Sequence, residues 1–408
     1  MLESNTERLR LTARIGEVFT PSAPVDEAEL FAGRLNQVRE VINAVTQRGQ
    51  HAIIYGERGV GKTSLANVLS SYLPDRRVRG WNTVIANCEE TTTFSSLWQQ
   101  VTREMTVTRQ DKKIGFESET TPTQLSLESL LSLDVNPDDV RYIFQKIASP
   151  TIVIVDEMDR IKDRATTTRL ADTVKTLSDH SVDVTLILVG VADSVDDLIA
   201  EHRSIERALV QIQMPRMSDR ELYEIVEKGL DEVGMTIEDK AKQHIAKLSQ
   251  GLPHFTHLLS LHAAQNAAPN GRTNITEDDV EEAIRLAVDK TTQSIVTDYH
   301  AATTSPRDTL FPQVLLACAL AEKDQLGYFS AVAVRSPLRT ITGKPYDIPA
   351  FSRHLKVFCD ETRGPILQKT GQRKRYLYRF IKPMMEPYVT MKGLESGLIT
   401  NDYLDGQL

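Results

Sequence analysis

A glycine-rich octapeptide near the start of the chain has the residue types and spacing to bind phosphate. It reads Gly56-Glu57-Arg58-Gly59-Val60-Gly61-Lys62-Thr63 and follows the pattern G-x-x-x-x-G-K-[S/T]. Glycines let a backbone turn tightly enough to point successive N–H groups at phosphate oxygens. We expect Lys62 to reach the β- and γ-phosphates of a nucleotide and the Thr63 hydroxyl to ligate Mg²⁺.

The sequence on either side of this octapeptide supports phosphate binding. The apolar run 51–55 before it predicts a buried strand, and residues 64–69 after it predict a helix. The amino end of that helix, with Ser64, would add its positive dipole end to the phosphate site. A chance glycine-rich turn is the alternative, but the order of strand, loop and helix favours a nucleotide.

Two adjacent carboxylates could complete such a site. The run Thr151-Ile152-Val153-Ile154-Val155 leads directly into Asp156 and Glu157. Continuous apolar residues are typical of a parallel strand that is covered on both faces. Asp156 would hold Mg²⁺, directly or through water, and Glu157 would polarise the attacking water as a general base.

Further strands and helices must position these groups. Strands are predicted at 82–88, 184–190 and 208–214, and helical segments alternate with them, as in a parallel α/β sheet. Ligands of such sheets lie beyond the carboxyl ends of the strands. Asp193, after the strand 184–190, is therefore a candidate contact for the γ-phosphate or the water, with an ordinary turn as the alternative.

The segments before, within and after this predicted sheet differ in their predicted structure. Residues 1–30 predict a loose arm, and Phe31-Ala32-Gly33-Arg34 then begins a helix that lies either beside the nucleotide base or at an ordinary helix start. Residues 103–139 are polar and weakly periodic, which fits a disordered surface excursion or a loop that contacts DNA or a partner. From Ser218 onward, capping boxes at 218–221, 236–239 and 276–279 predict a small helical lid.

The tail from Ala301 onward differs in charge from the rest. It has 15 Lys and Arg against 10 Asp and Glu, whereas the whole chain carries a net charge of −8. Helices at 310–320 and 349–358 precede two predicted strands, and the loop between the strands is basic, as in a winged helix. Four cations of this hairpin are candidates for DNA phosphate contacts: Arg373, Lys374, Arg375 and Arg379. A hairpin tip that charge merely keeps solvated is the alternative.

Composition narrows the class of protein. The chain has 408 residues, enough for two or three domains, and 40% of them are hydrophobic. Its three cysteines are far apart and form no C-x-x-C pair, which fits a reducing compartment without disulfides or a zinc site. The sequence has no signal-peptide pattern and no apolar run of about 18 residues, so we expect a cytoplasmic protein without a membrane span.

Together these motifs resemble those of the AAA+ ATPases, over about residues 31–290. The resemblance rests on Gly56–Thr63, on the run from Ile152 to Arg160, and on Arg207 before the last strand. The segment Phe31–Arg34 is similar to the entry motif that lies beside the adenine, which implies that Arg34 contacts the nucleotide. The predicted winged helix makes the origin-recognition or initiator-like ATPases the most similar group, and the transposition-associated ATP-binding regulators are related.

The resemblance implies ATP bound between subunits, with an arginine finger that reaches the γ-phosphate of the neighbour. Arg207 occupies the matching place and Arg203 is the alternate, and a surface arginine at a helix end is the alternative explanation. Two features depart from the initiator pattern. The strand 184–190 lacks the Asn often found after it, and Gly251-Leu252-Pro253-His254 carries no lid arginine. His254 either contacts phosphate when protonated or is structural, and the Gly-Leu-Pro is similar to that of the signalling STAND NTPases.

We therefore expect an α/β P-loop NTPase of the AAA+ type with four parts. These are an arm (1–30), an ATPase base with a parallel sheet (31–216), a helical lid (217–300) and a winged helix (301–408). The expected function is an oligomeric switch that binds ATP and Mg²⁺, hydrolyses ATP slowly and binds DNA. The alternative is a signalling or defence ATPase of the STAND type, whose winged helix contacts proteins instead of DNA.

Overall fold

The computed structural model describes residues 5–25, 27, 30–73, 81–109, 123–127, 131–132, 134–147, 149–199, 205–305, 310–372 and 375–406. The chain forms two compact units. The sheet unit comprises Arg34–Gly56 and Lys62–Met214, and the lid-and-tail unit comprises Met1–Gly33, Glu57–Gly61 and Pro215–Leu408. Within the described ranges, no helix is both long and apolar enough to cross a bilayer.

The sheet unit is built on five parallel strands in the order β2-β5-β6-β1-β7. They are β1 (His51–Gly56), β2 (Asn82–Asn87), β5 (Thr151–Asp156), β6 (Val184–Val191) and β7 (Leu209–Gln213). All five predicted strands of this sheet are confirmed. Because β1 and β5 run in the same direction, the residues that follow them, Lys62–Thr63 and Asp156–Glu157, emerge at the carboxyl edge of one sheet.

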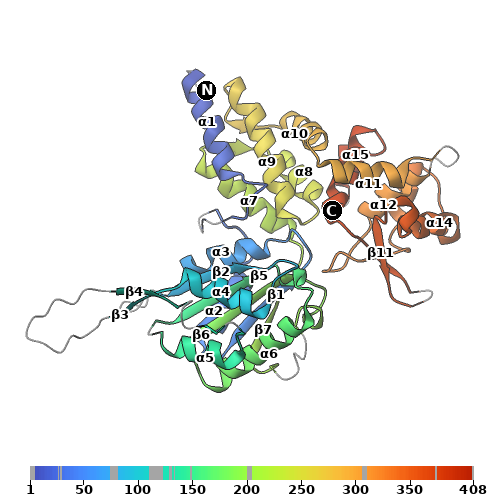
Figure 1. Cartoon of the computed structure of the whole chain (residues 1–408). Helices are drawn as coiled ribbons and strands as arrows, with labels where there is room; N and C mark the ends of the chain where they lie inside the picture. The colour runs from blue at the N-terminus through green and yellow to red at the C-terminus, as the bar shows by residue number, and fades with distance from the viewer. Residues whose placement is uncertain are drawn as a thin grey trace, which may run out of the picture. The chain divides into compact units, whose positions relative to one another are not determined.

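Helices cover both faces of this sheet (Figure 1). They are α2 (Leu35–Thr46), α3 (Lys62–Tyr72), α4 (Phe94–Glu104), α5 (Pro137–Gln145) and α6 (Arg164–Asp179), with short turns η2 (Met158–Arg160) and η3 (Val195–Asp197). Val153 and Val155 of β5 join one core with α4, α5 and α6. On the other face α2 and α3 pack against β1. This two-sided burial explains why the inner strands β1, β5 and β6 are buried along almost their whole length.

Part of segment 103–139 is ordered as a hairpin. Strands β3 (Thr106–Arg109) and β4 (Thr123–Ser126) pair in antiparallel fashion, separately from the five-stranded sheet. Figure 1 shows them projecting from the sheet unit. The expectation of little structure was therefore wrong for these eight residues, because backbone pairing forms a ladder that needs no strong side-chain periodicity.

Four helices form the lid. They are α7 (Asp219–Glu232), α8 (Asp239–Ser249), α9 (Pro253–Ala267) and α10 (Glu277–Asp289), with a turn η5 (Ala268–Asn270) and a short parallel pair, β8 (Thr236–Ile237) and β9 (Asn274–Ile275). The capping boxes at Ser218 and Thr276 are confirmed. The third predicted box is wrong: Thr236 lies in β8, and Glu238 begins α8 without a side-chain cap.

The expectation of a loose N-terminal arm is also wrong. Residues Asn5–Val18 form helix α1, which lies beside α9 (Figure 1). Its buried face consists of Leu11, Ile15 and Val18, and the next residue, Phe19, is buried on the backbone of Gly229, where any side chain would collide with its ring. Helix α1 is only weakly amphipathic and gains its stability from this packing, which cannot be inferred from the sequence alone.

The tail contains six helices and a three-stranded antiparallel sheet of order β10-β12-β11 among its described residues. The elements are α11 (Gln293–Thr303), α12 (Phe311–Ala319), β10 (Phe329–Ser330), α13 (Arg335–Thr342), α14 (Ile348–Phe358), η6 (Glu361–Arg363), β11 (Leu367–Thr370), β12 (Leu377–Phe380), α15 (Met385–Glu395) and α16 (Asn401–Asp405). The two predicted helices and both predicted strands are confirmed. The third strand, β10, has only two residues and was too short to predict.

Candidate functional site

The two motifs of the sheet unit meet through one hydrogen bond. The Thr63 hydroxyl, in the first turn of α3, donates to Asp156 Oδ2, at the end of β5, over 2.7 Å. The other carboxylate oxygen, Oδ1, accepts the backbone N–H of Glu157 at 2.7 Å. Two residues 93 positions apart in sequence thus place a hydroxyl and a carboxylate side by side. Hard oxygen donors of this kind suit Mg²⁺.

Burial disfavours the charged form of this carboxylate. Asp156 is 4% exposed, and burial raises its pKa above the ordinary value, while the hydrogen bonds from Thr63 and Glu157 oppose the rise. A desolvated carboxylate is stabilised when a cation approaches it. The electrostatics therefore fit a divalent ion held by Thr63 and Asp156.

Glu157 has a strained backbone and a half-exposed side chain. Its φ of 57° lies in the left-handed region, which is unfavourable for a residue with a side chain. Its carboxylate pairs with Arg160 at 2.8 Å, and the side chains of both are 47% exposed. The neighbouring Asp159 accepts the backbone N–H of Val191 at 2.8 Å and so ties this turn to the end of β6. An exposed carboxylate at this edge can reach a water molecule.

Lys62 is folded back along its own loop. Its side chain is buried, and Nζ donates to the Gly56 carbonyl at 3.1 Å. Gly56 itself could not carry a side chain, because a Cβ there would lie 2.4 Å from the Met214 carbonyl oxygen. The close approach of β7 thus explains why glycine begins the loop.

In the lid-and-tail unit, residues Glu57–Gly61 lie against the Gly-Leu-Pro segment. A Cβ at Gly59 would lie 4.0 Å from Leu252, and one at Gly61 would lie 3.9 Å from Pro253. Both loop glycines have left-handed φ values, 87° and 92°. Of the other loop residues, Arg58 is exposed and Val60 is buried. The segment that resembles the STAND NTPases therefore lies next to the phosphate-binding loop.

His254 follows that segment and is already engaged. Its Nδ1 lies 2.6 Å from the Pro21 carbonyl, so Nδ1 carries the proton that it donates. Burial lowers the pKa of His254, although the bond to Pro21 opposes this. Since the neutral ring has only one N–H, His254 has no second donor for a phosphate. This geometry supports the structural role for His254 and not the phosphate contact.

The segment at 31–34 is anchored on helix α7 of the lid. Lys228 Nζ donates to the Phe31 carbonyl at 2.8 Å, and the Gly33 N–H donates to Glu224 at 3.1 Å. Arg34, which begins α2, is 2% exposed and has a φ of 59°. A left-handed arginine at a helix start is unusual and fits a specialised position.

Two other expected site residues lie at opposite edges of the sheet unit. Asp193 follows β6 at the carboxyl edge, and its neighbour Ser194 forms a capping box with Asp197. Arg207 is exposed in the turn before β7, at the amino edge. A strand of five residues spans roughly 17 Å. Arg207 is therefore too far from Lys62 and Thr63 to act at the carboxyl edge of its own chain. The alternate, Arg203, lies outside the described residues.

Of the four hairpin cations, only Arg375 and Arg379 are described. Arg375 is exposed. Arg379 stacks on the Tyr328 ring at 4.4 Å and donates to the Leu326 carbonyl at 3.1 Å. Arg379 is thus held within the fold by contacts that compete with a DNA phosphate. Arg373 and Lys374 fall outside the described residues.

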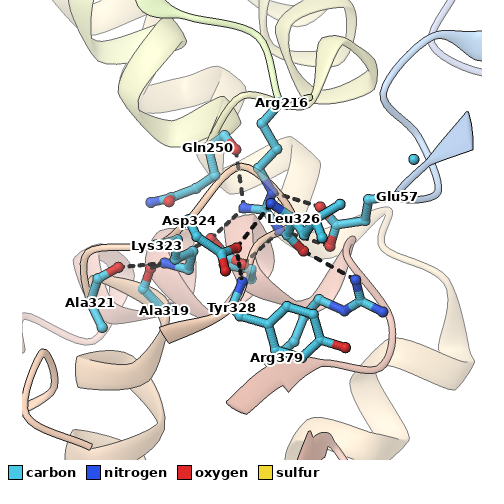
Figure 2. Close-up of polar contacts among 12 residues, drawn as sticks. Glu57, Arg216, Gln250, Ala319, Ala321, Lys323, Asp324, Leu326, Tyr328 and Arg379 are labelled. Atoms are coloured by element: carbon cyan, nitrogen blue, oxygen red, sulfur yellow. Dashed lines mark hydrogen bonds and ion pairs between the residues drawn. The ribbon is translucent and has the colours of Figure 1, made fainter. Parts of the chain in front are cut away.

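One cluster of charges was not predicted. In the lid-and-tail unit, Arg216 pairs with the carboxylate of Glu57 (Figure 2). Arg216 and Lys323 both pair with Glu386 as well. A signal existed in the sequence: Glu386 stands as a single acid in the apolar run Met384-Met385-Glu386-Pro387-Tyr388-Val389. A lone carboxylate in such a run must find a buried partner. The identity of that partner could not be inferred.

Comparison with known proteins agrees with this site. The profile of the novel STAND NTPase 1 family matches residues 23–334, which include both nucleotide motifs and the Gly-Leu-Pro segment. No curated protein matches the chain at a significant level.

Solved structures match over almost the whole chain. A Walker-type ATPase of Pyrococcus abyssi is 15% identical, with 91% of this chain and 99% of that chain covered and a TM-score of 0.51. The Aeropyrum pernix ORC1 protein in complex with DNA is 13% identical (94% and 97% covered, TM-score 0.48). The RuvB Holliday junction branch migration motor of Thermotoga maritima is 14% identical (88% and 96% covered, TM-score 0.44).

The Walker-type ATPase has the same P-loop NTPase fold that the sequence predicts for this chain. The family profile covers about three quarters of the sequence. The chain belongs to the novel STAND NTPase 1 family.

Proposed function

We propose that this protein is a switch that binds ATP with Mg²⁺ and hydrolyses it slowly. The hydrogen bond between Thr63 and Asp156 carries the proposal, because it joins the phosphate-binding motif to the carboxylate motif at one edge of the sheet. The membership in an NTPase family supports it.

Each residue of this edge has a role in the proposal. The backbone N–H groups from Gly59 to Ser64 would bind phosphate oxygens, and Lys62 would turn from the Gly56 carbonyl to the β- and γ-phosphates. Thr63 and Asp156 would hold Mg²⁺, which neutralises phosphate charge when bound. Glu157 would then polarise the attacking water once Arg160 releases its carboxylate.

Nucleotide titration of three variants tests this function. Lys62→Ala should weaken ATP binding by about a hundredfold, since a buried cation that contacts two phosphates is lost. Glu157→Gln should retain binding but lose hydrolysis by a factor on the order of 10² to 10⁴. Lys175→Ala, at an exposed position on α6, should change neither and is the control. ATP turnover by Lys62→Ala at the wild-type rate would refute the proposal.

We also propose that the subunits assemble, with Arg207 as the finger that acts on a neighbouring copy. Its exposed place at the amino edge supports action in trans, because it lies far from its own Lys62. The test mixes two inactive variants. Arg207→Ala keeps an intact Glu157, and Glu157→Gln keeps an intact Arg207, so an interface between the two can combine both groups. Mixtures that show no activity above the separate variants would exclude a finger in trans.

The tail from 301 to 408 is proposed to be a winged helix that binds DNA. Its surplus of positive charge and its antiparallel sheet support this proposal. The triple variant Arg373→Ala, Lys374→Ala and Arg375→Ala should weaken binding to duplex DNA and reduce the slope of log K against log salt by about three. Arg285→Ala, an exposed cation of α10, is the control. No binding by the wild type at low salt would exclude a DNA role.

The second candidate is a signalling or defence ATPase whose tail contacts a protein. The family match favours it, because the STAND group is the one that the Gly-Leu-Pro segment resembles. The internal contacts of Arg379 also favour it, since they occupy a cation that DNA would need. Failure of the DNA experiment together with intact nucleotide binding would support this candidate.

A further inference from the structure

The cluster around Arg216 uses every donor of one guanidinium. Arg216 Nε and Nη2 donate to the two oxygens of Glu57 at 2.7 and 3.0 Å. Nη1 and Nη2 donate to the two oxygens of Glu386 at 2.7 and 3.0 Å, and Nη1 also donates to the Gln250 carbonyl at 3.2 Å. Arginine has five N–H groups, and all five are used here. The guanidinium is therefore shared between Glu57, Glu386 and the Gln250 carbonyl.

The second cation of the cluster is equally restrained. Lys323 Nζ contacts the carbonyls of Ala319 and Ala321 at 2.6 and 2.8 Å and Glu386 at 3.0 Å. Burial lowers the pKa of Lys323, and the charge of Glu386 opposes this. Burial also lowers the pKa of Arg216. The charges of Glu386 and Glu57 raise this pKa by more, so that its net change is upward. The four side chains are at most 11% exposed.

A turn of the tail lies beside Glu57 (Figure 2). In the turn Asp324–Tyr328, a Cβ at Gly327 would lie 3.2 Å from both carboxylate oxygens of Glu57. Arg379 of β12 holds this turn through the Leu326 carbonyl and the Tyr328 ring. Residues of the phosphate-binding loop are thus packed directly against the tail within one unit.

The charges of this cluster balance. Two carboxylates and two cations give a net charge of zero, so each cation compensates a buried acid. Glu57 is the second residue of the loop that would face a polyphosphate, and without compensation its negative charge would repel the ligand. Arg216 supplies that compensation, yet two of its five donors are given to Glu386 of helix α15.

We propose that Arg216 is a positioning residue of the phosphate-binding loop, and that the tail regulates nucleotide affinity by competing for its guanidinium through Glu386. The inference rests on the proposed nucleotide site. A bound polyphosphate draws the guanidinium towards the loop and weakens its hold on α15. By linkage, loosening of α15 strengthens nucleotide binding.

Two substitutions that break the same contact from opposite sides test the idea, with MgADP as the probe in calorimetry of the full chain. Arg216→Gln leaves a net charge of −1 and should weaken binding roughly tenfold, whereas Glu386→Gln leaves +1 and should strengthen it to a similar degree. Arg216→Lys should restore part of the loss, because it returns the charge without the fork. Glu395→Gln, the same change elsewhere on α15, should have no effect. Shifts of the same sign in Arg216→Gln and Glu386→Gln would overturn the proposal.

Hydrogen exchange in the wild-type protein tests the proposal without any substitution that could impair folding. Saturating MgADP should speed exchange of the amides in Asp324–Tyr328 and in the first turns of α15, as α15 loosens. Unchanged or slower exchange there, with MgADP bound, overturns the regulatory role and leaves the proposed function intact. Failure of the wild type to bind MgADP refutes both.

Discussion

Removal of the Thr63 hydroxyl separates the magnesium role of this residue from its structural role. Thr63→Val keeps the branched shape but loses the 2.7 Å bond to the buried Asp156 carboxylate. Hydrogen bonds to charged groups contribute about 1.5–3 kcal/mol, and the partial exposure of Thr63 favours the lower value. We therefore expect a loss of about 1.5 kcal/mol in the free energy of unfolding, which lowers Tm by roughly 3–6 °C in a unit of this size.

The functional effect of Thr63→Val should be larger than its effect on stability. With one of two protein ligands lost, Mg²⁺ should no longer tighten ATP binding, so the dissociation constants measured in Mg²⁺ and in EDTA should converge. Calorimetry under both conditions, alongside thermal melts, measures the two effects. Thr63→Ser keeps the hydroxyl and should retain the magnesium effect. If Thr63→Val still binds ATP more tightly with Mg²⁺, the assignment of Thr63 as a metal ligand is wrong.

Two further predictions concern buried polar groups. His51 accepts the Leu186 N–H at 2.9 Å, and burial lowers its pKa to about 4, so it is neutral when folded. Unfolding then takes up a proton below the unfolded pKa of about 6.5, and stability should fall by roughly 3 kcal/mol as the pH drops from 6.5 to 4. His51→Asn, which keeps the acceptor but does not titrate, should show a smaller fall in urea melts, and an equal fall would contradict this account. Asp279 accepts two bonds from Arg272 and caps α10 through Thr276, so Asp279→Ala should cost about 3 kcal/mol. The exposed Asp278→Ala should cost less than about 0.5 kcal/mol in the same melts, and equal costs would show that the capping network adds nothing.

The strands and helices that could be predicted are specified by patterns over a few neighbouring residues. The inner strands were found because burial on both faces favours apolar runs such as 151–155. The lid helices were found because Ser218 and Thr276 cap them through residues only three positions away. Helix α1 was missed because its stability comes from packing against α9, more than 230 residues later in the chain.

The candidate site likewise has residues that the sequence predicts and contacts that only the structure shows. The sequence by itself determined the phosphate-binding loop and its carboxylate partners, because the spacing of glycine, lysine and acids follows directly from the geometry of phosphate and magnesium binding. Only the tertiary structure decided that His254 is engaged by Pro21 and that Arg216 joins Glu57 to Glu386, over separations of 159 and 170 residues. Sequence periodicity specifies which face of a helix or strand is buried. It does not show which charged residues, far apart in the sequence, will form ion pairs. Those pairings depend on how whole elements pack, and here they connect the nucleotide loop to the tail.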